Sequence, residues 1–166
     1  MKVLVVYYSL SGNTRKLGEL IAQSLAGQAE VAVEELTETK ERKGFRGFLA
    51  TSRDALTRRK SGIEPLKADV SSCEIVVIGT PVWAMTMASP VRTFLGEHAN
   101  RFKEVAFFLT TGGAGVRKTF RDMEALCGKT PLATLGISEK ELKDDEALRE
   151  RVKTFVNALS EDKEAD

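Results

Sequence analysis

The sequence predicts an α/β protein in which five parallel strands form one sheet with helices on both faces. Short apolar runs alternate with helix-like segments along the whole chain, and turn residues bound each run. Strands that alternate with helices pair in parallel, because each helix returns the chain to the starting edge of the sheet. A chain of 166 residues has the length of one domain, so we expect residues 1–166 to form a single three-layer unit.

Five segments have the composition of strands, which is short runs of β-branched or aromatic residues between turn residues. The first is a continuous apolar run, as is typical of a strand buried on both faces. The second alternates Val31 and Val33 and then continues with charged Glu34, as a more exposed strand does. In chain order, the expected strands are Val3 to Tyr8, Glu30 to Leu36, Glu74 to Gly79, Glu104 to Thr110 and Pro131 to Ile137.

Five helices are expected, one after each strand. The first places Leu17, Ile21 and Leu25 on one face, which is the spacing of a helix that packs on a sheet. The expected helices are Thr14 to about Ala26, a segment within Lys40 to Lys60, Ser89 to Ala99, Val116 to Cys127 and Asp144 to Leu159.

The second of these helices is strongly basic. Lys40 to Lys60 contains eight basic and two acidic residues, a local balance of +6, with apolar residues at helical spacing. We interpret it as a sheet-covering helix with a solvated basic face, and docking of an acidic protein is the functional alternative. Nucleic acid is not an expected partner, because the whole chain has a net charge of only +1. Contact with a membrane surface is an equally distant alternative.

The composition argues against several classes of protein. No apolar run approaches the roughly 18 residues of a membrane span, and no signal-peptide pattern is present, so we expect a cytoplasmic protein without a membrane span. Cys73 and Cys127 lie far apart without a histidine cluster, which predicts two small buried residues and no metal site. His98, the single histidine, is interpreted as a solvated residue near a helix end.

A hydroxyl-rich turn follows the first strand. Ser9-Leu10-Ser11-Gly12-Asn13-Thr14 joins that strand to the start of a helix. The first N–H groups of a helix have no partner within it, and the helix dipole is positive there, so this junction favours a phosphate. A simple helix cap at Ser11 or Asn13 is the alternative.

Two more unusual loops follow the third and fourth expected strands. Thr80 to Pro90 contains the single tryptophan, Trp83, and Thr110 to Gly115 contains three glycines. The carboxyl ends of parallel strands meet at one edge of a sheet, so the three loops should converge there. A phosphate cradle beside a flat aromatic face predicts a nucleotide site. The alternatives are that Trp83 is a core residue and that the glycines form a plain turn.

Other nucleotide sites have different sequence signatures. A dinucleotide fold requires G-x-G-x-x-G after the first strand and a P-loop requires G-K-[ST], and neither motif occurs. Phospho-receiver proteins require carboxylates where Ser9 and Thr80 stand, and the three loops contain no acid-base or Ser-His-Asp set for hydrolysis.

The three loops together resemble those of the flavodoxin family. Ser9-x-Ser11-Gly12-x-Thr14 resembles its phosphate loop, with serine where members often have threonine, and the other two resemble its ring-binding loops. The resemblance covers essentially the whole chain and implies the three-layer flavodoxin-like fold with noncovalently bound FMN. It implies phosphate contacts from Ser9, Leu10, Ser11, Gly12, Asn13 and Thr14. It implies ring contacts from Thr80, Pro81, Val82, Trp83, Ala84, Met85, Thr111, Gly112 and Gly113, with Trp83 stacked on the ring.

The resemblance implies a low-potential electron-transfer protein that acts with redox partner proteins. No catalytic residue is predicted, because the flavin itself takes the electrons. An FMN-dependent NAD(P)H:quinone-type oxidoreductase is the alternative, and a flavodoxin-like oxidase of porphyrin precursors ranks third. The ring loops lack the acidic residues usual in the family, and Arg15, Lys16, Arg92, Arg117 and Lys118 lie nearby. We therefore expect a neutral to basic rim, partners with acidic docking faces, and a monomer or homodimer.

Overall fold

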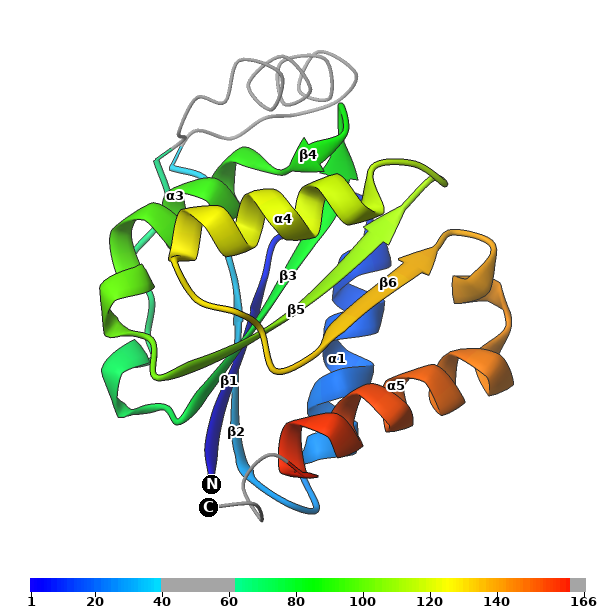
Figure 1. The fold of residues 1–166 in the computed structure, drawn as a ribbon, viewed down its shortest axis with the longest axis horizontal. Helices are drawn as coiled ribbons and strands as arrows, with labels where there is room; N and C mark the ends of the chain where they lie inside the picture. The colour runs from blue at the N-terminus through cyan, green and yellow to red at the C-terminus, as the bar shows by residue number, and fades with distance from the viewer. Residues whose placement is uncertain (40–61, 162–166) are drawn as a thin grey trace.

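The structure is a computed structural model that describes residues 1–39 and 62–161. The described residues form five parallel strands in the order β2-β1-β3-β5-β6, with a short sixth strand, β4, antiparallel to β3 (Figure 1). The strands are β1 (Lys2–Tyr7), β2 (Glu30–Glu35), β3 (Ile75–Trp83), β4 (Thr86–Met87), β5 (Glu104–Thr111) and β6 (Thr134–Ser138). The predicted parallel α/β sheet is confirmed.

In the described part of the chain, four helices cover the sheet on its two faces, two on each (Figure 1). One face carries α1 (Asn13–Leu25) and α5 (Asp145–Glu161), and the other carries α3 (Ser89–His98) and α4 (Val116–Cys127). The described connections also contain the single-turn helices η1 (Val70–Ser72), η2 (Ala99–Arg101) and η3 (Glu141–Lys143). The expected basic helix within Lys40 to Lys60 lies outside the described residues.

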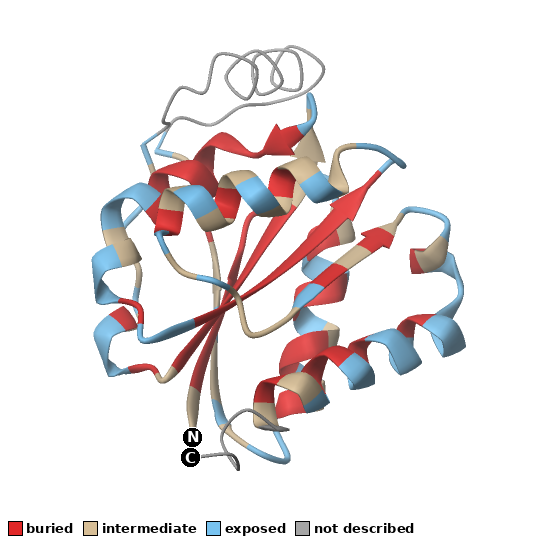
Figure 2. Cartoon of the chain, viewed as in Figure 1, coloured by how far each residue is buried: buried red, intermediate tan, exposed pale blue. Residues whose placement is uncertain are grey.

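The core consists of two apolar layers, one on each face of the sheet. Val3, Val5 and Tyr7 of β1 pack with α1 and α5, whereas Leu4 and Val6 pack with α3 and α4. Because successive side chains of a strand point to opposite faces, burial on both faces requires the continuous apolar run seen in the sequence. Figure 2 shows the resulting buried central strands. Cys73 and Cys127 lie in the second layer as free, buried thiols, as predicted.

β3 is longer than the sequence predicts, and most of the expected loop from Thr80 to Pro90 belongs to β3, β4 and the start of α3 instead. The strand continues to Trp83, turns at Ala84 and Met85, and returns as β4. Glycine and proline usually interrupt a strand, yet β3 continues through Gly79 and Pro81. Here Gly79 has a packing role, because a Cβ at this position would lie 2.0 Å from Cζ of Phe108 on β5.

Candidate functional site

The topology brings three loops to one edge of the sheet. β3 lies between β1 and β5, and all three strands run in the same direction, so their carboxyl ends are neighbours. The chain leaves β1 toward β2 on one side and leaves β3 toward β5 on the other. The strand order therefore reverses between β1 and β3, which is the position where sheets of this kind bind ligands.

The turn from Ser9 to Thr14 forms a backbone cradle at the start of α1. Gly12 has a φ of 95°, a conformation that favours glycine, and a Cβ there would meet nothing within 4 Å. The Ser9 Oγ accepts hydrogen bonds from the N–H groups of Gly12 at 3.1 Å and Arg15 at 3.2 Å. Ser9 therefore fills the capping role that the sequence indicated for Ser11 or Asn13.

Several N–H groups of this turn remain available to a ligand. Among the described residues, those of Ser11, Asn13 and Thr14 have no hydrogen-bond acceptor. The Ser11 side chain is exposed beside them. Unpaired donors at a helix N-terminus bind anions, so the geometry fits the predicted phosphate.

Thr14 makes a contact that the sequence did not reveal. Its hydroxyl lies 2.8 Å from the hydroxyl of Thr110 at the end of β5, and both side chains are buried. Two hydroxyl groups hold two hydrogens, and their mutual bond uses only one. The pair thus ties α1 to β5 and retains one O–H donor for another acceptor. Thr110 was not among the predicted binding residues, because a partner 96 positions away leaves no local signal.

The turn between β3 and β4 has an unusual backbone. Val82 pairs with Met87 and Trp83 with Thr86, which leaves Ala84 and Met85 as a two-residue loop with φ values of 49° and 64°. Two consecutive positive φ angles characterise the type I′ hairpin turn, which normally contains Asn-Gly. Each left-handed residue other than glycine costs about 1–2 kcal/mol, so the surrounding structure must hold this turn in place.

Apolar side chains are exposed around the hairpin. Trp83 is half-buried and meets Tyr8 edge to face, with ring centroids 5.7 Å apart and planes at 86°. Met85 is 49% exposed and Leu10, in the first loop, is 43% exposed. Within the described residues only one other large apolar side chain, Val33, is exposed to this degree. Exposed apolar groups beside an anion cradle fit a ligand with a phosphate and an apolar ring.

Thr80 lies deeper than predicted. Its side chain is fully buried, and its hydroxyl donates to the carbonyl of Pro81 and accepts from the N–H of Ala88 at 3.0 Å. The hydroxyl therefore closes the base of the hairpin, and the expected contact of Thr80 with a ring stays a prediction.

The third loop packs against the hairpin. The Thr111 hydroxyl donates to the carbonyl of Ala114 and accepts from the N–H of Gly113, which holds the loop in a tight turn with Gly112 and Gly113 exposed. A Cβ on Gly115 would lie 3.0 Å from Cα of Met85. The second and third loops are thus in contact, as their predicted convergence requires.

The expected basic rim is largely neutralised. Arg15 pairs with Glu35 at 2.7 Å, and this pairing raises the pKa of Arg15. Lys16 pairs with Asp145 at 3.0 Å, and Lys118 pairs with Asp122 on its own helix. Arg92 is only 9% exposed and points into the protein. Of the basic residues predicted for the rim, Arg117 is exposed and has no ion-pair partner among the described residues.

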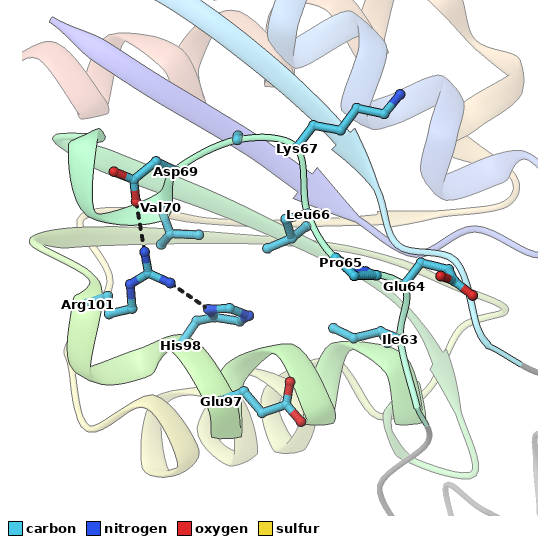
Figure 3. Close-up of a pocket in the computed structure, with 11 residues that line it drawn as sticks. Ile63, Glu64, Pro65, Leu66, Lys67, Asp69, Val70, Glu97, His98 and Arg101 are labelled. Atoms are coloured by element: carbon cyan, nitrogen blue, oxygen red, sulfur yellow. Dashed lines mark hydrogen bonds and ion pairs between the residues drawn. The ribbon is translucent and has the colours of Figure 1, made fainter.

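His98 lies at the end of a helix, α3, as predicted, but its side chain is not fully solvated. It is half-buried, stacks on Phe94 with ring centroids 5.1 Å apart, and lines a cavity of about 530 Å³ (Figure 3). Arg101 lies between His98 and Asp69, 3.5 Å and 2.8 Å from them. The cavity lies at the carboxyl end of α3, whereas the hairpin precedes the start of that helix.

The environment of His98 predicts a pH-dependent stability. Burial, and then the positive charge of Arg101, lower the pKa of His98 below 6.5. The unfolded chain then takes up this proton more readily, so stability falls as the pH drops from above 6.5 through the lowered pKa. We expect the free energy of unfolding in urea to fall less between pH 7.5 and 5.5 for His98→Gln than for the wild type. Identical pH profiles for the two proteins would contradict this explanation.

The described residues contain neither a cluster that could hold a metal ion nor a helix that could span a membrane. Among the residues described, no three His, Cys, Asp or Glu side chains come together as a possible metal site. None of the helices in the same part of the chain is long and apolar enough to cross a membrane.

Comparison with known proteins identifies a family. The family model described as Flavodoxin matches residues 2–159. A search of curated proteins found no match.

Solved structures share the fold. A flavoprotein from Lactobacillus acidophilus, crystallised in complex with FMN, is 23% identical over 86% of this chain and 97% of its own, with a TM-score of 0.69. A flavodoxin from the domain Archaea is 19% identical over 95% of this chain and 99% of its own, with a TM-score of 0.55. The Flv1 flavodiiron core from Synechocystis is 19% identical over 97% of this chain and 36% of its own, with a TM-score of 0.57. At these identities the likeness concerns the fold alone.

Proposed function

Because the chain belongs to the flavodoxin family, whose cofactor is FMN, we propose that it is a low-potential electron carrier between redox proteins. Bound FMN supplies the chemistry, since it accepts and donates one or two electrons. The observation that supports this proposal best is the convergence of an anion cradle, an exposed apolar hairpin and a glycine loop at one edge of the sheet.

The residues of the three loops have distinct roles in this proposal. The N–H groups of Ser11, Asn13 and Thr14 bind the phosphate, and Gly12 permits the turn that aims them. Ser9 holds that turn closed through its two accepted hydrogen bonds. The positive end of the α1 dipole adds to the attraction for a dianion.

The ring contacts come from the other two loops. Trp83 and Met85 supply apolar surface, and the backbone of Ala84, Gly112 and Gly113 can approach the ring closely because these residues have small or no side chains. Apolar surroundings disfavour a negative charge that develops on the ring, which lowers its reduction potential. These contacts bind and orient the ring, and they leave the transfer of electrons to the cofactor.

Docking of partners is supported by one exposed patch. Arg117 and Arg121 flank the half-buried Phe120 on α4, directly after the glycine loop. Neither arginine has an ion-pair partner within residues 1–39 and 62–161. Exposed positive charges around an apolar side chain are complementary to an acidic partner surface, and they accelerate encounter more than they strengthen binding.

Anaerobic stepwise reduction of the FMN-loaded protein tests the electron-carrier function. A carrier is expected to show two separate one-electron potentials and slow oxidation of NADH or NADPH when a quinone is the only acceptor. A single two-electron potential with rapid, quinone-dependent oxidation of NADPH would instead identify an NAD(P)H:quinone oxidoreductase. A protein that takes up no FMN would contradict both functions.

A further inference from the structure

A series of hydrogen-bonded polar groups, buried at Thr86 and Arg92, lies behind the β3–β4 hairpin. Arg92 Nη2 on α3 donates to the hydroxyl of Thr86 on β4 at 2.9 Å. That hydroxyl donates in turn to Oδ2 of Asp122 on α4 at 3.0 Å, and Lys118 pairs with the same carboxylate. Thr86 is 3% exposed and Arg92 is 9% exposed, so the bond between them lies in the interior. The side chains of Asp122 and Lys118 are 24% and 42% exposed, so the series of bonds reaches the surface at that end.

Each bond in this series has a fixed direction. A guanidinium can only donate and an ionised carboxylate can only accept, so the Thr86 hydroxyl must accept from Arg92 and donate to Asp122. Its single hydrogen and one of its lone pairs are both used. The hydroxyl therefore connects both helices of this face to β4, and Figure 1 shows β4 beside them.

Thr86 links these hydrogen bonds to the β3–β4 turn of the candidate site. It pairs with Trp83 and so closes the two-residue turn of Ala84 and Met85. A hairpin with only two residue pairs is marginal by itself, and this one contains two left-handed residues that are not glycine. On the other side of the turn, Gly115 at the start of α4 lies against Met85. The turn is thus held by contacts with its neighbours.

We propose that Thr86, Arg92 and Asp122 are positioning residues that hold the Ala84–Met85 turn in the conformation that binds the flavin ring. The inference rests on the proposed FMN site, since the turn belongs to its ring-binding loop. Packing alone does not explain the arrangement, because burying the charge of Arg92 costs desolvation energy and an apolar residue fills such a space equally well. The charged groups instead give the hydroxyl, and with it the turn, one defined position.

The central test is Thr86→Val, which keeps the shape of the side chain and removes the hydroxyl. Thr119→Val is the matched control, because Thr119 on α4 is also fully buried and its hydroxyl has no partner among the described residues. Thr86→Ser restores the hydroxyl without the methyl group. FMN affinity is measured by titration and global stability by urea unfolding for each variant.

We expect Thr86→Val to raise the Kd for FMN roughly tenfold, as is typical when a hydrogen bond to a charged group is lost. The Kd of Thr119→Val for FMN should stay within about twofold of the wild-type value, because this change removes no hydrogen bond among the described residues. The Kd of Thr86→Ser should stay within about the same range, because serine keeps the hydroxyl. Equal affinities for Thr86→Val and Thr119→Val would overturn the proposal.

A second variant separates positioning from general stability. Ala84→Gly removes the steric cost of the left-handed conformation, so the double variant Ala84→Gly with Thr86→Val should regain most of the lost affinity. If Thr86→Val weakened binding only by lowering the global stability of the protein, Ala84→Gly would not restore the affinity for FMN. If the double variant binds no better than Thr86→Val, the role of Thr86 is structural and the proposal fails.

Amide hydrogen exchange provides a measurement that needs no cofactor. The amides of Trp83 to Met87 should exchange about tenfold faster in cofactor-free Thr86→Val than in Thr119→Val, while those of β5 are unchanged. If the wild type failed to bind FMN, the proposed function would fall and this comparison would still decide whether the network holds the turn. Equal exchange rates in the hairpin of both variants would refute it.

Discussion

Gly79→Ala is expected to destabilise the protein by about 3 kcal/mol, the upper end of the usual cost of overpacking a core. A Cβ at position 79 would lie 2.0, 2.3 and 2.5 Å from three carbons of the Phe108 ring. Carbon atoms that are not bonded prefer separations of about 3.5–4.0 Å, so the ring or the strand must shift by more than 1 Å. A loss of this size is a large fraction of the total stability of a small protein.

The ring of Phe108 has little room to move. It is fully buried and meets Tyr7 edge to face, with centroids 6.4 Å apart. A Cβ at Gly18 of α1 would lie 3.2 Å from Phe108 and 2.6 Å from Tyr7, so the two rings occupy the space left open by two glycines. Gly79 also precedes the hairpin of the candidate site, so the strand cannot shift there without displacing Trp83.

Urea unfolding of three variants tests this prediction. Gly27→Ala is the control, because Gly27 is exposed and a Cβ there would meet nothing within 4 Å. Its free energy of unfolding should stay within about 0.5 kcal/mol of the wild-type value. Combining Gly79→Ala with Phe108→Leu should recover part of the loss, because the smaller side chain makes space. If Gly79→Ala and Gly27→Ala were equally stable, the packing explanation would be wrong.

The elements predicted best are those whose signals are local. β1 was evident because burial on both faces demands an uninterrupted apolar run. The predicted bounds of α4, Val116 to Cys127, agree with the structure because glycines with positive φ, Gly115 and Gly128, flank the helix. The convergence of the three loops followed from the parallel order of the strands alone.

Features that depend on distant partners were not predictable in the same way. β3 extends through Gly79 and Pro81 because Phe108 of a neighbouring strand fills the space above the glycine. The turn at Ala84 and Met85 has no residue typical of its conformation, and bonds from two helices flank it. The basic rim was overestimated, because local charge counting does not reveal ion pairs such as Arg15 with Glu35.

Trp83→Ala is expected to weaken FMN binding about 10- to 100-fold, which corresponds to about 1.4–3 kcal/mol for a lost aromatic contact and its buried area. Trp83 lies at the end of β3 with its side chain half-buried, between the protein core and the exposed hairpin. The Trp83 and Tyr8 rings meet edge to face, with an angle of 86° between their planes. Because the Trp83 side chain is only half-buried, part of the indole remains open to a ligand. Trp83 is the only tryptophan, so quenching of its fluorescence reports FMN binding directly in the wild type.

Two comparisons separate ring binding from packing on Tyr8. Trp83→Phe keeps an aromatic face and should retain most of the affinity, whereas both variants lose the indole ring that meets Tyr8 in an edge-to-face contact. Since the side chain is only half-buried, Trp83→Ala should also reduce the free energy of unfolding of the cofactor-free protein by less than it reduces the free energy of FMN binding. Titration with FMN, followed by its own fluorescence in the variants, gives the second quantity. Unchanged affinity in Trp83→Ala together with a loss of stability would assign Trp83 to the core and move the ring site to Met85 and the glycine loop.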